Sequence, residues 1–178
     1  MKPDLVIFDG SNFYHGAKRI SPQTHLTRFD YRKLAEAVCK NKNLKIEYCV
    51  GEIRRRKRDP KSFRLYSNQQ LLFINLEKQG ILVKKGFMLK SDGVYREKGV
   101  DVRIALDILR GALKDEYRRC FIISSDTDLV PAILDSRTTK KEIIYVGFEG
   151  KLSNALHAVC SRTILLARKQ IATCAPKH

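Results

Sequence analysis

The sequence lacks the features that mark secreted, membrane-spanning or repetitive proteins. Its five cysteines are an odd number without a CxxC pair, so we expect reduced thiols in a cytoplasmic setting. No apolar run is long enough to cross a bilayer. The apolar run in the opening MKPDLVIFDG has four residues and ends in aspartate, so no signal peptide is expected. The chain also contains no internal repeat, linker or low-complexity block.

Acidic residues are scarce as well. The chain has 19 Asp and Glu against 35 Lys and Arg, a formal net charge of +16 and a pI near 9.8. Such an excess of positive charge indicates a polyanionic partner, most commonly nucleic acid. A membrane surface is the alternative partner, but no long basic amphipathic helix stands out. We therefore predict no membrane association.

Length and composition indicate one globular domain. Of the 178 residues, 43% are hydrophobic and 30% are charged, which is ordinary for a folded protein. A chain of this length can bury a substantial core. We predict a single domain over residues 1–166, followed by a basic C-terminal tail over residues 167–178 that frays.

Short apolar runs alternate with helical patterns along the chain. Asp30 is a candidate helix N-cap, and Asp92-Gly93 suggests a hairpin or a surface turn. This alternation predicts an α/β protein, with a doubly wound, mostly parallel sheet of five or six strands and helices on both faces. Strands are predicted at residues 5–8, 46–50 (half exposed), 81–83, 120–123, 143–146 and 163–166, and helices at 62–79, after Asp101 and at 153–159.

The stretch CFIISSDTDLVP, residues 120–131, places two aspartates directly after a strand. Its unbroken apolar start predicts a strand buried on both faces. Asp128 is predicted to be the N-cap of the following helix, with Pro131 in the first turn. Asp126 and Asp128 then leave the carboxyl end of a central strand, where ligands bind in open α/β sheets. The alternative is that both aspartates serve only the turn and the cap.

Two further aspartates are predicted to join this pair. Asp9 ends the strand at 5–8, and Asp101 begins the helix that leads to the strand at 120–123, although an acid there also simply complements the helix dipole. If the two strands are neighbours, all four carboxylates gather where the winding of the sheet reverses. Charges about 4 Å apart repel by roughly 4 kcal/mol at an effective dielectric of 20, so the cluster needs protons or cations. These oxygen ligands favour Mg²⁺ or Mn²⁺ over Zn²⁺.

A run of cations follows the second predicted strand. Five positive charges in sequence repel one another, so we expect a loop. A solvated loop or a nuclear address is the alternative, but a phosphate-contacting loop agrees better with the net charge. The run consists of Arg54, Arg55, Arg56, Lys57 and Arg58.

Three motifs in this order resemble the NYN branch of PIN-like ribonucleases: DGSN at the first strand, KGVD before a helix, and SSDTDLVPAI after a strand. The resemblance extends from about residue 5 to 148. It implies a Rossmann-like PIN fold and metal-dependent cleavage of RNA phosphodiesters. Ser125 stands where a glycine is common in the family, and Leu129 where an aromatic residue is common, but neither departure removes an acid.

The resemblance also implies roles for individual residues. Asn12 would orient a ligand or the attacking water, and Lys98 would meet a phosphate. The metal-binding acids would be Asp9, Asp101, Asp126 and Asp128.

The prediction is a ribonuclease that hydrolyses single-stranded or structured RNA with Mg²⁺ or Mn²⁺. One alternative is an RNA-binding module of the same fold that does not cut. Another is a phosphatase of the haloacid dehalogenase type, although that class carries its DxD motif on the first strand. Nucleotide binding is a further alternative, but no GxGxxG or Walker-type loop follows the first strand. The sequence leaves the oligomeric state open between monomer and homodimer.

Overall fold

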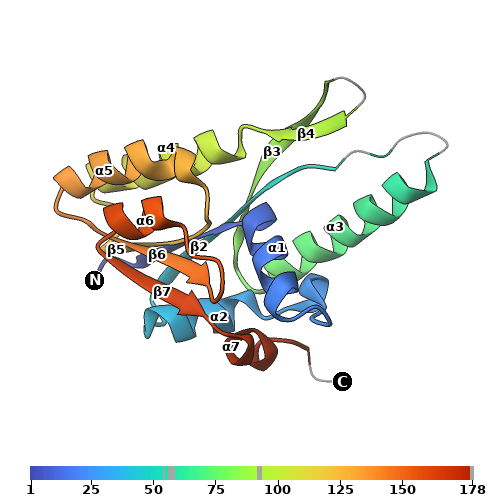
Figure 1. Ribbon diagram of the computed structural model, residues 1–178, viewed down its shortest axis with the longest axis horizontal. Helices are drawn as coiled ribbons and strands as arrows, with labels where there is room; N and C mark the ends of the chain where they lie inside the picture. The colour runs from blue at the N-terminus through green and yellow to red at the C-terminus, as the bar shows by residue number, and fades with distance from the viewer. Residues whose placement is uncertain (54, 56–58, 92–93, 177–178) are drawn as a thin grey trace.

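Strands and helices alternate along the chain (Figure 1). The structure is a computed structural model that describes residues 1–53, 55, 59–91 and 94–176, with only the backbone for 90, 91 and 94–96. In chain order the elements are β1 (Asp4–Asp9), α1 (Gly10–Ile20), η1 (Leu26–Arg28), α2 (Tyr31–Cys39), β2 (Leu44–Gly51), α3 (Pro60–Lys78), β3 (Leu82–Ser91), β4 (Val94–Lys98), α4 (Val100–Leu113), β5 (Arg119–Ile123), η2 (Thr127–Leu129), α5 (Val130–Thr138), β6 (Glu142–Phe148), α6 (Asn154–Val159), β7 (Arg162–Leu166) and α7 (Arg168–Thr173).

The strands form one sheet in the order β4-β3-β2-β1-β5-β6-β7. All neighbours are parallel except β3 and β4. The first half of the chain extends the sheet on one side of β1 and the second half on the other, which confirms the doubly wound α/β prediction. The described residues give seven strands instead of five or six, because β4 folds back on β3. Asp92 and Gly93, predicted to form the turn between them, lie outside the described residues.

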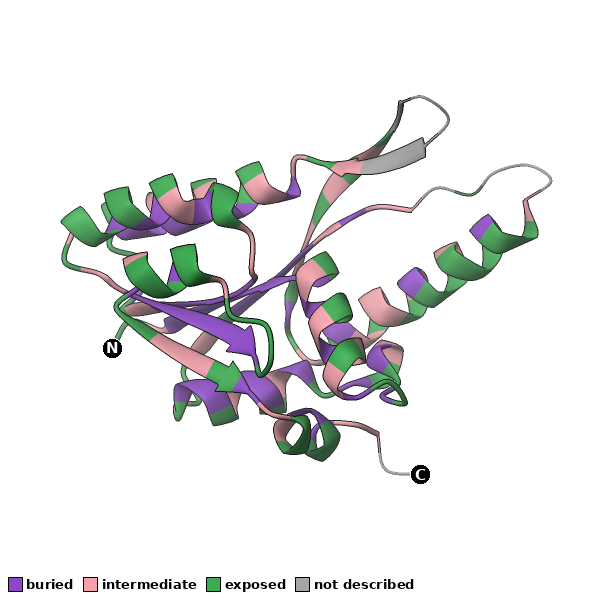
Figure 2. Ribbon diagram, viewed as in Figure 1, coloured by how far each residue is buried: buried purple, intermediate pink, exposed green. Residues whose placement is uncertain are grey.

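Helices cover both faces of the sheet (Figures 1 and 2). On one face, α1, α2 and α7 enclose an aromatic core in which the ring centroid of Phe13 lies 5.2 Å from that of Phe8 and 5.4 Å from that of Tyr31. On the other face, α4, α5 and α6 cover strand residues such as Ile7 and Ile122. Successive residues of β1 contribute to opposite cores because strand side chains alternate. β1 is therefore held rigidly between two cores, with its carboxyl end at the edge of the sheet.

Strand β2 is more buried than its sequence pattern predicts. Residues 46–49 are all buried, including Glu47, whose side chain is 1% exposed. The Lys84 ammonium lies 2.9 Å from Glu47 Oε2 and 2.8 Å from Asp107 Oδ2. A buried charge is tolerated when it is paired in this way. The prediction of a half-exposed strand was wrong because the polar residue of the alternating pattern faces a covered side of the sheet.

The C-terminal residues pack against the domain. Ile171 is fully buried and Cys174 is 3% exposed, on one face of α7 and the turn that follows it. The backbone N–H of Asp30 donates to the Cys174 carbonyl at 2.9 Å. The prediction of a fraying tail was therefore wrong for residues 168–174, because two apolar residues three positions apart outweigh the flanking charges. The boundary at residue 166 stays a prediction, and residues 177 and 178 lie outside the described part of the chain.

All five cysteines are free and buried, in agreement with the expectation of reduced thiols. Among the described residues, no helix is both long and apolar enough to cross a membrane.

Candidate active site

Asp9 is held firmly at the carboxyl end of β1. Only 1% of the residue is exposed. Its Oδ2 accepts hydrogen bonds from the Ser124 hydroxyl and from Asn12 Nδ2, both at 2.7 Å, and its Oδ1 accepts from the Asn12 backbone N–H at 3.1 Å. The last bond makes Asp9 the N-cap of α1. Burial raises the pKa of Asp9, although these hydrogen bonds oppose the shift. Both carboxylate oxygens are thus positioned by neighbours on α1 and in the loop after β5.

Asn12 is held in turn by a second hydroxyl. Ser125 Oγ donates to Asn12 Oδ1 at 2.5 Å, while Asn12 Nδ2 donates to Asp9. The amide orientation is therefore set, with its oxygen committed to Ser125 and one N–H of the amide group not used by Asp9. That N–H can donate to a ligand, which agrees with the role that the resemblance implies.

Asp126 and Asp128 follow β5 within a short 3₁₀ turn. The Asp126 backbone N–H donates to Ser124 Oγ at 3.1 Å, and Asp126 Oδ1 accepts from the Asp128 N–H at 2.9 Å. Asp126 is thus the cap of η2, and α5 begins at Val130 without a side-chain cap. The prediction that Asp128 caps the helix was wrong, because the intervening 3₁₀ turn moves the cap two residues towards the strand. Asp128 is exposed and carries no capping duty.

Asp101 lies in the first turn of α4, where it meets the other acids. Gly99, with φ +78°, adopts the left-handed conformation that starts the helix. Burial raises the pKa of Asp101 to about 6, and the charges of Asp126, Asp9 and Asp128 with a hydrogen bond to Asp126 add to the shift. Asp101 therefore interacts electrostatically with each of the other three predicted aspartates. The adjacency of β1 and β5 brings them together at this edge of the sheet.

Glu97 is a fifth carboxylate at this place, and sequence analysis missed it. Its Oε2 accepts a hydrogen bond from the Gly51 backbone N–H at 2.5 Å. A Cβ on residue 51 would lie 2.6 Å from that oxygen, so only glycine at the end of β2 leaves room for the carboxylate. Burial raises the pKa of Glu97, and the charges of Asp9 and Asp101 raise it further. The only signal in the sequence was its place beside the KGVD motif.

Replacing Glu97 tests its contribution to cation binding. Glu97→Gln keeps an acceptor for the Gly51 N–H but removes one negative charge, so we expect Mn²⁺ affinity to fall roughly 10-fold. Isothermal titration calorimetry of the metal-free protein measures this change. Glu77→Gln, at an exposed position on α3, is the matched control and should bind Mn²⁺ like the parent. Equal affinities in both variants would show that Glu97 only supports the end of β2.

The structure describes only two of the six residues that are predicted to contact phosphate, Arg55 and Lys98. Arg54, Arg56, Lys57 and Arg58 lie outside the described residues. The Arg55 guanidinium lies 4.7 Å from the ring centroid of Tyr66 and 5.6 Å from that of Phe63, at the start of α3. Lys98 is exposed at the end of β4, next to Glu97. The RNA contacts of these six residues stay predictions.

The carboxylates of the candidate active site are suitable ligands for a hard divalent cation. They offer only oxygen ligands, and their mutual repulsion, which raises the pKa of Asp101, is relieved by positive charge. Among the described residues, no three side chains of the His, Cys, Asp or Glu type are already close enough to form a metal-ligand group. Asp126 is only half-buried and Asp128 is exposed, so these side chains have room to turn towards a cation. The donor set therefore fits Mg²⁺ or Mn²⁺.

Comparisons with known proteins agree with this fold. A crystal structure of a protein of unknown function from Vibrio parahaemolyticus is similar, with a TM-score of 0.67 over 93% of each chain at 18% sequence identity. Curated protein sequences gave no match. The sequence profile of the NYN domain, which has a PIN-like, nuclease-type fold, matches residues 5–167. That match covers nearly the whole chain, which therefore belongs to the NYN domain family.

Proposed function

We propose that the protein is a metal-dependent ribonuclease that hydrolyses phosphodiester bonds at the Asp9, Asp101 and Asp126 edge of the sheet. The observation that carries the proposal is the gathering of these carboxylates, with Asp128, in a protein of net charge +16. An uncompensated acidic cluster does not stabilise the fold, because its carboxylates repel one another. A cluster of acids in a basic protein suits a polyanion that is held by cations and cut at a metal.

The residues of this chain would act by position and charge. A divalent cation held by Asp9, Asp101, Asp126 and Asp128 would supply Lewis-acid chemistry, lowering the pKa of the attacking water and neutralising the leaving oxygen. Ser124 fixes the Asp9 carboxylate, and Ser125 fixes Asn12. Asn12 then offers an amide N–H to the attacking water or to the phosphate. No protein nucleophile is required.

The direct test is incubation of the parent protein with a mixed pool of labelled RNA, with and without Mn²⁺ or Mg²⁺. We expect shortened RNA only with a cation, and none with Asp9→Asn. An RNA-binding module would retain RNA without cutting it, and a phosphatase would release phosphate from small monoesters while leaving internal RNA bonds intact. Cleavage that continues in EDTA would contradict the proposed mechanism.

Cation binding should also raise the thermal stability of the protein. A ligand at 100 times its Kd stabilises the folded state by about 2.7 kcal/mol. At roughly 2–4 °C per kcal/mol for a chain of this size, Mn²⁺ should raise the thermal midpoint by about 5–10 °C. Asp9→Asn should lose most of this increment, because it removes a charge from the cluster. A parent midpoint that does not move at millimolar Mn²⁺ would count heavily against a cation site.

A further inference from the structure

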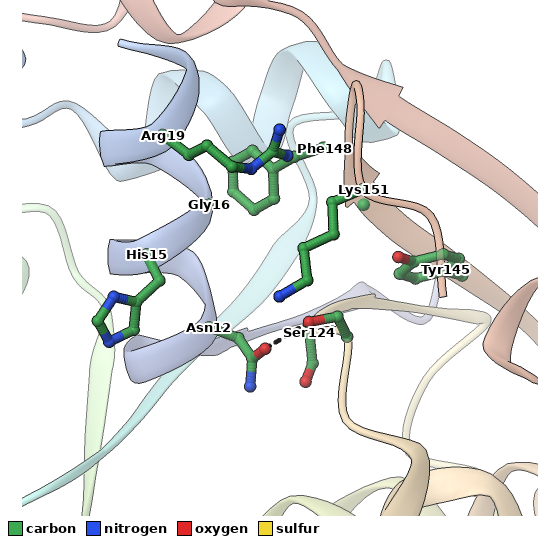
Figure 3. A pocket seen from close by; sticks show the side chains of 10 residues that line it. Asn12, His15, Gly16, Arg19, Ser124, Tyr145, Phe148 and Lys151 are labelled. Atoms are coloured by element: carbon green, nitrogen blue, oxygen red, sulfur yellow. Dashed lines mark hydrogen bonds between the residues drawn. The ribbon is translucent and has the colours of Figure 1, made fainter. Parts of the chain in front are cut away.

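A small pocket adjoins the acidic cluster, between α1 and the loops that follow β5 and β6 (Figure 3). It shares Asn12, Ser124 and Ser125 with the candidate active site, whereas the four aspartates do not line it. Its volume is about 110 Å³. Sites for whole small molecules usually measure roughly 300–1,000 Å³, so this pocket suits a single chemical group.

The residues that line the pocket carry positive charge, whereas the adjacent acidic cluster is negative. Arg19 and His15 project from α1, Lys151 follows β6, and no Asp or Glu lies among the lining residues. Arg19 Nη2 donates to the Glu149 carbonyl at 2.8 Å, which holds the guanidinium in place. In Figure 3 the Lys151 side chain extends into the pocket towards Asn12 and Ser124. The pocket is therefore lined by two cations from different parts of the chain, and it shares Asn12, Ser124 and Ser125 with the acidic cluster.

Neither cation is neutralised within the protein. In the part of the chain that the structure describes, no ion pair joins Arg19 or Lys151 to a carboxylate, and the Lys151 ammonium makes no hydrogen bond. Some other cations among the described residues are paired, such as Lys84 with Glu47 and Asp107. A guanidinium and an ammonium are donors that match the oxygens of phosphate, whereas the hydroxyls of Ser124 and Ser125 already donate to Asp9 and Asn12.

We propose that this pocket binds a phosphate group of the RNA strand beside the bond that is cut, with Arg19 and Lys151 as its cations. The choice of RNA rests on the proposed function. A phosphate held here fixes the strand at a set distance from Asp9 and Asp126, and so determines which bond reaches the acids. The phosphate is either internal or at a strand end, and both sources have the same oxygens for the pocket to recognise.

Binding without a divalent cation tests the pocket independently of cleavage. In EDTA, three eight-residue oligouridylates carrying a 5′-phosphate, a 3′-phosphate or neither are titrated by fluorescence anisotropy. Relative to the parent, Arg19→Gln/Lys151→Gln should bind at least ~10-fold more weakly, and its salt slope should fall by about 1.4, or 0.7 for each lost contact. Arg28→Gln/Lys169→Gln removes the same charge at exposed positions outside the pocket and is the matched control.

The three oligonucleotides identify the phosphate. A loss confined to the 5′-phosphorylated or to the 3′-phosphorylated strand assigns the pocket to that end, and an equal loss on all three assigns it to an internal phosphate. Lys151→Gln alone should show a substantial part of the loss, and it should fold like the parent, because the Lys151 side chain is exposed and makes no hydrogen bond or ion pair among the described residues. A pocket variant that binds all three strands as the control does overturns the proposal.

Cleavage by the parent separates this inference from the proposed function. If the parent cuts RNA with Mn²⁺ while the pocket variant binds and cuts like its control, the ribonuclease proposal holds and the phosphate pocket is wrong. If the parent never cuts but the pocket variant loses phosphate-dependent binding, the pocket is right and the protein binds RNA without hydrolysing it.

Discussion

Asp126→Asn should slow metal-dependent RNA cleavage at least ~100-fold. Asp126 acts on Asp101 and Asp9 by charge, and it follows β5 where the two halves of the sheet meet. Loss of one well-placed electrostatic group in an active site typically costs 10²–10³ in kcat, or about 3–4 kcal/mol. Asparagine keeps the Oδ1 acceptor for the Asp128 N–H, so the 3₁₀ turn should survive. Single-turnover cleavage at saturating Mn²⁺ measures the effect.

The control separates catalysis from folding and from binding. Asp135→Asn, at an exposed position on α5, removes one acid outside the site and should cut like the parent. RNA affinity of Asp126→Asn in EDTA should hold or rise, because an anion near the phosphates is gone. Undiminished cleavage by Asp126→Asn would remove this residue from the mechanism.

Asp101 should make both stability and activity depend on pH. Its pKa is about 6 in the folded protein against an ordinary value of 3.8. Because the folded state holds the proton more tightly, the resulting stability is fully present below pH 3.8 and is lost as the pH rises through about 6. Asp101→Asn removes this loss. Without metal, its unfolding free energy relative to the parent should therefore increase by about 1 kcal/mol between pH 4 and 7.5, after allowance for the partial exposure of the side chain.

Urea unfolding in EDTA at both pH values measures this difference. If the difference in unfolding free energy between Asp101→Asn and the parent is the same at both pH values, the carboxylates do not crowd one another.

Cleavage should change with pH in the opposite direction. The acids bind a cation only when deprotonated, so the rate at subsaturating Mn²⁺ should fall at least ~10-fold from pH 7 to 4.5. Higher Mn²⁺ should move the midpoint to lower pH, because cation and proton compete for the same oxygens. If the pH midpoint of the cleavage rate does not change with the Mn²⁺ concentration, the titrating group lies outside the cation site.

Sequence patterns could locate four of the five acids because each follows a strand end or a helix start. Asp9 directly follows an apolar run, and Asp126 follows another after two serines. The parallel arrangement of those runs, confirmed by the β1–β5 pairing, places their ends at one edge. Ser125, where the family often has glycine, supplies the hydroxyl that holds Asn12. Leu129, where an aromatic residue is common, is fully buried. Both departures thus have structural roles that a pattern alone does not reveal.

The positions of Glu97 and of the proposed phosphate pocket could not be predicted because they depend on long-range packing. The Glu97 carboxylate reaches the acids only because β4 returns along β3 and Gly51 leaves space for it. Arg19 and Lys151 are far apart in the chain, and each taken alone is an ordinary surface cation. They line one pocket because β6 lies beside β5, an order of strands that periodicity does not specify.

The pairing of β1 with β5 determines when the candidate active site can form during synthesis of the chain. Leu5 lies opposite Cys120, so the central contact of the sheet closes a loop of more than a hundred residues. Such distant pairings form slowly, and on a ribosome they cannot form until the later strand has emerged. Asp9 is therefore synthesised long before the residues that complete its surroundings. A nascent chain therefore carries many of its cations before the acidic cluster is assembled, and under the proposed function it could cut RNA only after the two halves of the chain meet.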